Sequence, residues 1–239
     1  MNVADRIVEL LDLATPPVAI AFRDSAPAGI PRVAEAAVSG CSYWRQAAEA
    51  RQAAEGRGFY TEASDHFGCP VGCHTHGIDL PLEKAKELEG LVGTMVELKY
   101  LRMEEVEGIP RRTEPFGVAL YAPLAAASFE PDVVLITGNA KQMMLLAEAA
   151  HAAGISSEAS VMGRPTCAAI PAVMGSEGAT LNLGCIGNRV YTGLADDELY
   201  CAVAAGRLEV LVESLTTIVH ANRELEKFHR GRVSRAASQ

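Results

Sequence analysis

The sequence predicts an α/β fold in which helices flank a layered mixed sheet. Three observations support this prediction. Short apolar runs bounded by proline, glycine or aspartate are typical of buried strands, as in residues 16–22. Longer segments place apolar residues at helical spacing, most clearly in residues 207–230. The two kinds of segment are mixed along the chain, which favours shared layers of strands and helices.

The elements follow in order from these patterns. Residues 4–14 predict a short helix, and residues 41–56 predict an alanine-rich helix that stops at Gly56. Pro81 opens an amphipathic helix over residues 81–93. Residues 94–115 are charged and ambiguous. The other predicted strands are 58–63, 117–123, 131–138 and 179–185, and the other predicted helices are 140–154, 195–204 and 207–230.

Length, composition and net charge limit the class of protein. A chain of 239 residues with 49% hydrophobic and 21% charged residues suits one soluble globular domain over 1–239. A net charge of −9 argues against nucleic acid as a partner, since phosphate binding needs clustered basic residues. Residues 117–129 are the longest charge-free apolar stretch and are too short to cross a membrane. With no signal-peptide pattern, we expect a cytoplasmic protein, and we expect residues 231–239 to form a frayed tail.

An internal echo suggests two related halves, about 1–115 and 116–239. In each half an apolar strand precedes an alanine-rich helix, a segment containing "EAS", and a loop with a cysteine. If the echo reflects duplication, Cys69 and Cys167 face each other across a pseudo-twofold axis.

The stretch 66–77, "HFGCPVGCHTHG", is the most chemically loaded part of the chain. Cys69 and Cys73 are four residues apart, which places them on one face of a helical turn rather than in the tighter knuckle of structural zinc sites. Pro70 suits the first helical position, so Cys69 is a candidate N-cap, where the helix dipole stabilises a thiolate. Cys73, His74 and His76 are additional candidate metal ligands, or else a buried thiol and two loop histidines.

Three more cysteines occupy comparable positions. Cys41 follows a glycine at a predicted helix start, and Cys167 follows Arg164, which would lower its pKa, unless it is a core cysteine. Cys185 lies in a glycine-rich loop over 184–193. There Gly184, Gly187, Asn188 and Arg189 are candidates for binding a small anion, and a plain turn is the alternative.

Cysteines at helix starts and glycine loops differ from core cysteines, which fall inside strands or helices, as Cys201 does. In a reducing cytosol, dispersed thiols of this kind favour a metal site. We therefore expect Cys41, Cys69, Cys167 and Cys185 to hold an iron–sulfur cluster, of the [4Fe–4S] type, for redox or small-ligand chemistry.

Two alternatives stay open. One is a metal-free module that binds a small molecule or anion through the 184–193 loop. The other is an enzyme with a cysteine nucleophile, Cys69 or Cys167, although no catalytic set can be assigned. The expected partners are a small molecule or a redox partner, and the apolar stripe of residues 207–230 would serve a homodimer as readily as a core.

With these motifs assembled, the chain resembles the uncharacterised ArCR family, also called domain of unknown function 169. The resemblance runs from about Ala4 to Asn222 and is most specific at the cysteine after the second helix and in the "LGC-x-G-x-R" segment. It implies a prokaryotic protein with recurrent cysteines, which match Cys41, Cys69, Cys167 and Cys185, and it implies no activity. Cys73 and its neighbouring histidines look more particular to this chain.

Overall fold

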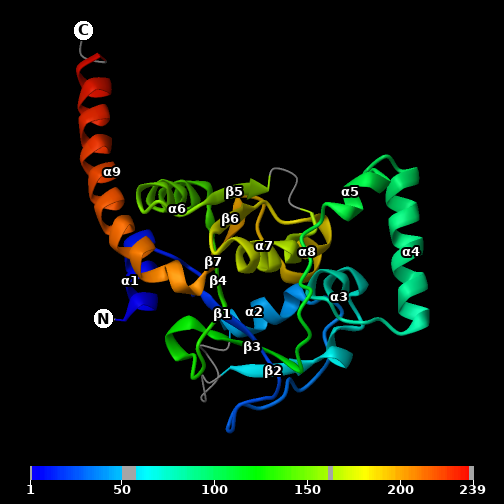
Figure 1. The fold of residues 1–239 in the computed structure, drawn as a ribbon. Helices are drawn as coiled ribbons and strands as arrows, with labels where there is room; N and C mark the ends of the chain where they lie inside the picture. The colour runs from blue at the N-terminus through cyan, green and yellow to red at the C-terminus, as the bar shows by residue number, and fades with distance from the viewer. Residues whose placement is uncertain (1, 50–57, 161–163, 237–239) are drawn as a thin grey trace.

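A computed structural model describes residues 2–49, 58–160 and 164–236. Over these residues one seven-stranded sheet forms the centre of the molecule, in the order β2-β3-β1-β4-β7-β6-β5 (Figure 1). The strands are β1 (Val18–Arg23), β2 (Phe59–Glu62), β3 (Val118–Pro123), β4 (Val133–Asn139), β5 (Ser157–Ser160), β6 (Ala179–Asn182) and β7 (Glu198–Ala204).

The sheet is mixed, as predicted. β1 pairs antiparallel with β3 and β4, and β4 pairs antiparallel with β7 from Val133 opposite Ala204 to Asn139 opposite Glu198. β5 and β6 pair in parallel at the edge, from Ser157 opposite Ala179. The prediction of an α/β fold with a layered mixed sheet is confirmed.

Helices cover both faces of the sheet. They are α1 (Val3–Leu11), α2 (Cys41–Glu49), α3 (Pro70–His76), α4 (Leu82–Glu97), α5 (Met103–Glu107), α6 (Ala140–Ala152), α7 (Ala169–Ser176), α8 (Ile186–Thr192) and α9 (Leu208–Ala236). Short 3₁₀ turns are η2 (Ala63–His66), η3 (Leu124–Ala126), η4 (Thr166–Ala168) and η5 (Ala205–Arg207). The end of the helix predicted over 41–56 falls on residues 50–57, which lie outside the described residues.

Two apolar clusters divide the core between the faces. On β4, Val134 and Ile136 pack in one cluster with α1, α6 and α9, whereas Val133 and Leu135 pack in the other with α2 and α7. This alternation follows from the strand period of two residues. The face of α2 and α7, called here the α2 face, also contains Cys41 and Cys167.

The helix predicted over 195–204 is wrong, because Glu198–Ala204 is the central strand β7. Its alternate side chains are buried on opposite faces of the sheet, Tyr200 on the α2 face and Cys201 on the other. A strand buried on both faces is apolar throughout, so its sequence has no period that separates it from a buried helix.

The frayed tail predicted over 231–239 is also wrong for the residues described, because α9 continues to Ala236. Ion pairs between residues one turn apart, such as Glu226 with Arg230 at 2.5 Å, support this part of the helix. None of the described helices is both long and apolar enough to cross a membrane.

The two alanine-rich helices of the internal echo lie on opposite faces of the sheet, since α2 packs in one cluster and α6 in the other. A twofold axis that exchanged the antiparallel neighbours β1 and β4 would run perpendicular to the sheet and keep both helices on one face. One twofold axis therefore does not relate these two helices.

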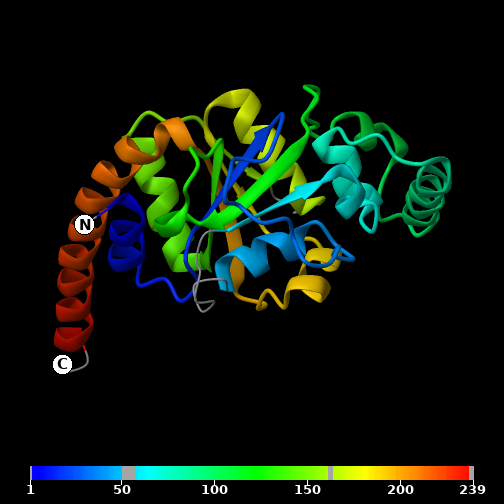
Figure 2. The same ribbon diagram turned by 90° about the horizontal axis from the view of Figure 1, so that it is seen from below.

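Two segments project from opposite ends of the molecule, as both views show (Figures 1 and 2). One is the last part of α9. The other, residues 82–107 with α4 and α5, is called here the arm. The chain returns from the arm to α3, where the Arg112 amide donates to the Thr75 carbonyl at 2.8 Å.

Candidate functional site: four cysteines at helix starts

Four of the cysteines lie where helices begin. Cys41 is the first residue of α2, and Cys69 is the N-cap of α3, followed by Pro70 at the first turn. Cys167 lies in η4, which runs directly into α7, and Cys185 is the N-cap of α8. The helix starts predicted at Cys41, Cys69 and Cys167 are confirmed, whereas Cys185 was predicted in a glycine-rich loop. Cys201 lies inside a strand, also as predicted.

Hydrogen bonds connect two of these helix starts. The Cys185 amide donates to Thr166 Oγ1 at 2.6 Å, which joins the start of α8 to η4. The Cys185 thiol in turn accepts a hydrogen bond from the backbone amide of Asn188 at 3.4 Å. Thr166 therefore places Cys185 beside the segment that contains Cys167.

The four thiols lie within electrostatic range of one another. The pKa of Cys41 is raised to about 12, chiefly by burial, and the charges of Cys69 and Cys185 contribute to this rise. Burial also raises the pKa of Cys167 well above its usual value, with added contributions from the charges of the other three thiols. Elements far apart in the chain thus bring Cys41, Cys69, Cys167 and Cys185 to one region.

The spacing of these thiols is not that of a single-ion site. Among the described residues, no three His, Cys, Asp or Glu side chains are grouped closely enough to hold one metal ion. A mononuclear zinc site needs Zn–S distances of about 2.3 Å, which brings its sulfurs almost into contact. In a cubane cluster each cysteine binds a different iron, so the sulfurs stand further apart.

A buried side-chain amide with poorly formed hydrogen bonds, that of Asn188, lies beside the thiols. The side chain of Asn188 is 1% exposed, and neither its Oδ1 nor its Nδ2 makes a hydrogen bond of normal geometry. It is nevertheless close enough to Cys41 to lower the pKa of that thiol in part. The same side chain also lies within reach of Tyr200, whose pKa it lowers in part. A buried amide with such weak bonds could improve its hydrogen bonding toward a bound group.

The expected lowered pKa of Cys167 is wrong, because burial outweighs any nearby positive charge. Arg164 lies over the ring of Tyr100 in the arm, 4.1 Å from its centroid. A neutral thiol with a raised pKa is a poor nucleophile. A bound metal would remove its proton outright.

The additional candidates in α3 have other partners. The thiol of Cys73 is buried and donates to the His66 carbonyl at 3.1 Å, and burial raises its pKa to about 12. His76 Nδ1 lies 2.8 Å from the Gly72 carbonyl. His74 is half-buried, which lowers its pKa.

Two buried histidines form a feature that the sequence reasoning missed. His66 is 1% exposed and His76 is 2% exposed, with their ring centroids 6.1 Å apart. Burial lowers the pKa of His66 to about 3 and that of His76 to about 4. Both rings are therefore neutral at physiological pH. A histidine-rich stretch resembles a metal motif in sequence, and no signal in it marks these two rings as core.

The glycine-rich loop predicted over 184–193 is wrong, because Ile186–Thr192 is the helix α8. Gly184, at φ +78, and Gly193, at φ +67, flank this helix in the left-handed region that favours glycine. Gly187 lies within its first turn. The two flanking glycines mark the beginning and the end of α8, and they do not form a loop around a ligand.

Arg189 joins the chain segments before and after α8 instead of facing a free anion site. Its guanidinium donates to the carbonyls of Leu183 at 2.6 Å, Ala195 at 2.5 Å and Glu198 at 3.1 Å. An anion at this guanidinium would compete with these backbone acceptors.

The Arg189→Lys substitution is expected to lower the free energy of unfolding by about 2 kcal/mol, because one ammonium cannot reproduce the forked bonds to three carbonyls. Urea unfolding of the wild type and the variant measures the change. If Arg189→Lys unfolds at the same urea concentration as the wild type, these bonds contribute nothing and the anion-binding role becomes favoured.

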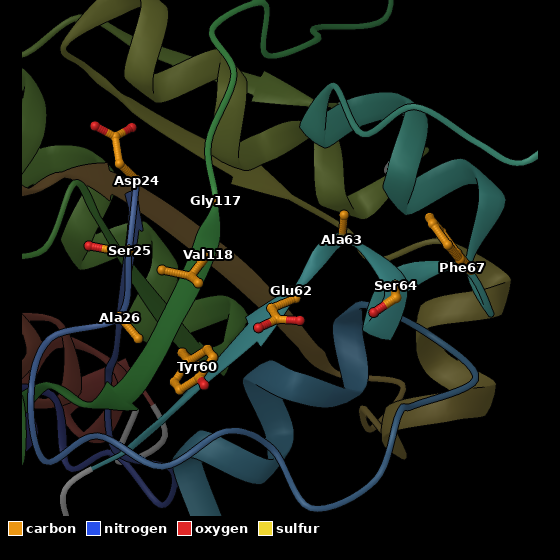
Figure 3. A pocket seen from close by; sticks show the side chains of 10 residues that line it. All are labelled: Asp24, Ser25, Ala26, Tyr60, Glu62, Ala63, Ser64, Phe67, Gly117 and Val118. Atoms are coloured by element: carbon orange, nitrogen blue, oxygen red, sulfur yellow. The ribbon is translucent and has the colours of Figure 1, made fainter.

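A separate depression lies at the ends of β1, β2 and β3 (Figure 3). It has a volume of about 580 Å³, with Asp24 at one end, Phe67 at the other, and Tyr60 and Glu62 between them. Glu62 is paired with Arg32 at 3.0 Å. No cysteine lines this depression.

The fold and the thiols define a class of protein: a mixed α/β domain whose cysteines, from widely separated segments, meet at helix starts. The chain belongs to the uncharacterised ArCR family, domain of unknown function 169, whose family model matches residues 6–214. This confirms the resemblance predicted from the motifs.

The chain is also similar to an uncharacterised protein of Methanocaldococcus jannaschii, with 30% identity over 113 residues. The match covers 46% of this chain and 48% of that protein, so it spans about half the length of this relative. No solved structure matches the chain.

Proposed function

We propose that the protein binds an iron–sulfur cluster through Cys41, Cys69, Cys167 and Cys185. The observation that supports this most strongly is the approach of four thiols from four separate helix starts, close enough for neighbouring thiol charges to raise the pKa of Cys41 and of Cys167. Four dispersed cysteines are the usual ligand set of a [4Fe–4S] cluster.

The surroundings suit such a group. Cys41 and Cys167 are buried in the apolar cluster on the α2 face, and Cys69 and Cys185 are half-buried. This arrangement would shield one side of the group and leave the other side near solvent and partners. The side-chain amide of Asn188, which makes no hydrogen bond of normal geometry, would donate to a ligating sulfur or to an exogenous ligand.

A cluster held here would supply one-electron transfer or an open metal position for a small ligand. The chain itself would contribute an apolar surrounding for the cluster and a fixed position for its ligands. The apolar residues around Cys41 exclude water, and Thr166 fixes the position of Cys185. A small molecule or a redox protein in the cytoplasm would be the partner.

The direct test is the visible spectrum and the iron and sulfide content of full-length protein purified without oxygen. The expected result is a broad band near about 400 nm with about four irons and four sulfides per chain. Single Cys→Ser substitutions at Cys41, Cys69, Cys167 and Cys185 are each expected to lower both contents several-fold.

Two matched substitutions complete this test. Cys201→Ser changes a buried thiol on the other face of the sheet, and Cys73→Ala removes a thiol already bonded to a backbone carbonyl. Both variants are expected to keep the iron. A colourless, metal-free protein would contradict the proposal, and so would a cluster that survives all four ligand substitutions. One-to-one alkylation of Cys69 with loss of a measured activity would instead favour the thiol enzyme.

A further inference from the structure

The arm has little packing to stabilise it. No residue of α4 or α5 is buried, and Leu82 and Leu98 are exposed. Gly90 and Gly93 lie inside α4, where each glycine costs about 1 kcal/mol relative to alanine. Helices of this length are marginal in water without a packed face. The arm therefore has the properties of an element that packs against something outside its own chain.

The end of α9 has the same properties at the opposite end of the molecule (Figures 1 and 2). Beyond Val219 no described residue of α9 is buried. The exposed side of this segment includes Phe228, at 55% exposure, and Val233, at 70%. Large apolar groups are thus present on both projections.

The two projections have opposite charge. Residues 82–107 contain seven acidic and four basic residues, a net charge of −3. Residues 220–236 contain five basic residues and two acidic ones, a net charge of +3. The acidic residues, Glu224 and Glu226, pair with Lys227 and Arg230 and leave the last turns of α9 basic. Charge complementarity of this kind steers association and fixes which surfaces meet.

We propose that the protein associates with a second copy of itself, with the end of α9 in one copy packed on the arm of the other. The two surfaces cannot meet within one protein, because they lie at opposite ends of the folded molecule (Figures 1 and 2). Two copies that each offer both surfaces can make the contact twice and close as a twofold dimer. A protein partner is favoured over a nucleic acid or a membrane, because the arm has a net charge of −3 and phosphate groups would repel it. This proposal does not depend on the presence of a cluster.

The test measures the mass of the full-length protein by sedimentation over a range of concentrations. The wild type is expected to form a dimer that weakens with added salt. Reversing the basic end with Arg230→Glu, Arg232→Glu and Arg235→Glu is expected to weaken association about tenfold or more. Reversing the arm with Glu97→Lys, Glu104→Lys and Glu107→Lys is expected to do the same.

Combining both reversals identifies the surfaces. The chain with all six substitutions has opposite charges again at the contact and is expected to recover most of the lost affinity. Glu35→Lys with Glu213→Lys changes exposed charges outside both projections and is expected to leave association unchanged. Circular dichroism of each variant checks that α9 and the arm remain helical.

Three outcomes would overturn the proposal. A wild type that sediments as a monomer at every concentration excludes self-association. A dimer insensitive to both reversals places the contact elsewhere. A monomer that binds anionic phosphatidylserine vesicles, and loses this binding when the arginines are reversed, assigns the end of α9 to membranes.

Discussion

Acidification from pH 7.5 to 4.5 is expected to lower the free energy of unfolding by about 5 kcal/mol, most of it from two histidines. His66 and His76 have pKa values of about 3 and about 4 in the folded protein, below the ordinary value of 6.5, because burial disfavours their charged forms. The unfolded chain takes up both protons below pH 6.5, while the folded chain does not. The stabilising contribution is therefore complete above pH 6.5 and is lost as the pH falls toward 4 and 3.

Urea unfolding at half-unit pH steps measures this effect. His66→Gln keeps a hydrogen-bonding group near Thr61 without a titrating ring, and it is expected to halve the loss between pH 7.5 and 4.5. His220→Gln replaces an exposed histidine and is expected to leave the pH profile unchanged. An unfolding free energy that stays constant from pH 7.5 to 5.5 would show that these rings are not buried in solution.

Replacing Gly117 by alanine is expected to cost about 3 kcal/mol or more of folding free energy. Gly117 precedes β3, and its amide donates to the Arg23 carbonyl at 2.9 Å. A Cβ at this position would overlap the carbonyl oxygen of Asp24, a backbone atom that cannot rotate away. The pairing of β1 with β3 would have to shift, and the depression that Gly117 lines would change with it.

Gly90→Ala provides the matched control, since a Cβ there would meet nothing within 4 Å. Its expected effect is no loss of stability, or a gain of up to about 1 kcal/mol from helix propensity. Thermal and urea unfolding of the two variants distinguish steric conflict from the general effect of replacing glycine. If both variants unfold at the same temperature and urea concentration as the wild type, the close approach of Gly117 to Asp24 does not exist in solution.

Much of the fold was predictable because local patterns agree with the tertiary structure. β1, β3 and β4 are short apolar runs between turn residues, and α6 ends just before Gly154, which has φ +66. The prediction failed at β7 because a central strand buried on both faces loses its alternation. It failed at α8 because glycines that flank a short helix resemble those of a loop.

The candidate site was predictable in its parts but not in its arrangement. Pro70 after Cys69 indicates a helix start, and the structure places one there. That the segments of Cys41 and Cys167 share one face of the sheet depends on strand order, which no local pattern encodes. The poorly bonded side-chain amide of Asn188 and the neutral pair of His66 and His76 depend on burial, which only tertiary packing decides.

The positions of the four thiols along the chain have a consequence for the order of events during synthesis. The four thiols come from segments that start with Cys41 and end with Cys185, so the gathering is complete only after most of the chain has left the ribosome. Any group that joins these thiols would close three loops, the longest of which runs 98 residues from Cys69 to Cys167. It would thereby reduce the entropy of the unfolded chain, as a cross-link does. Loading would then be a late event on an already folded protein.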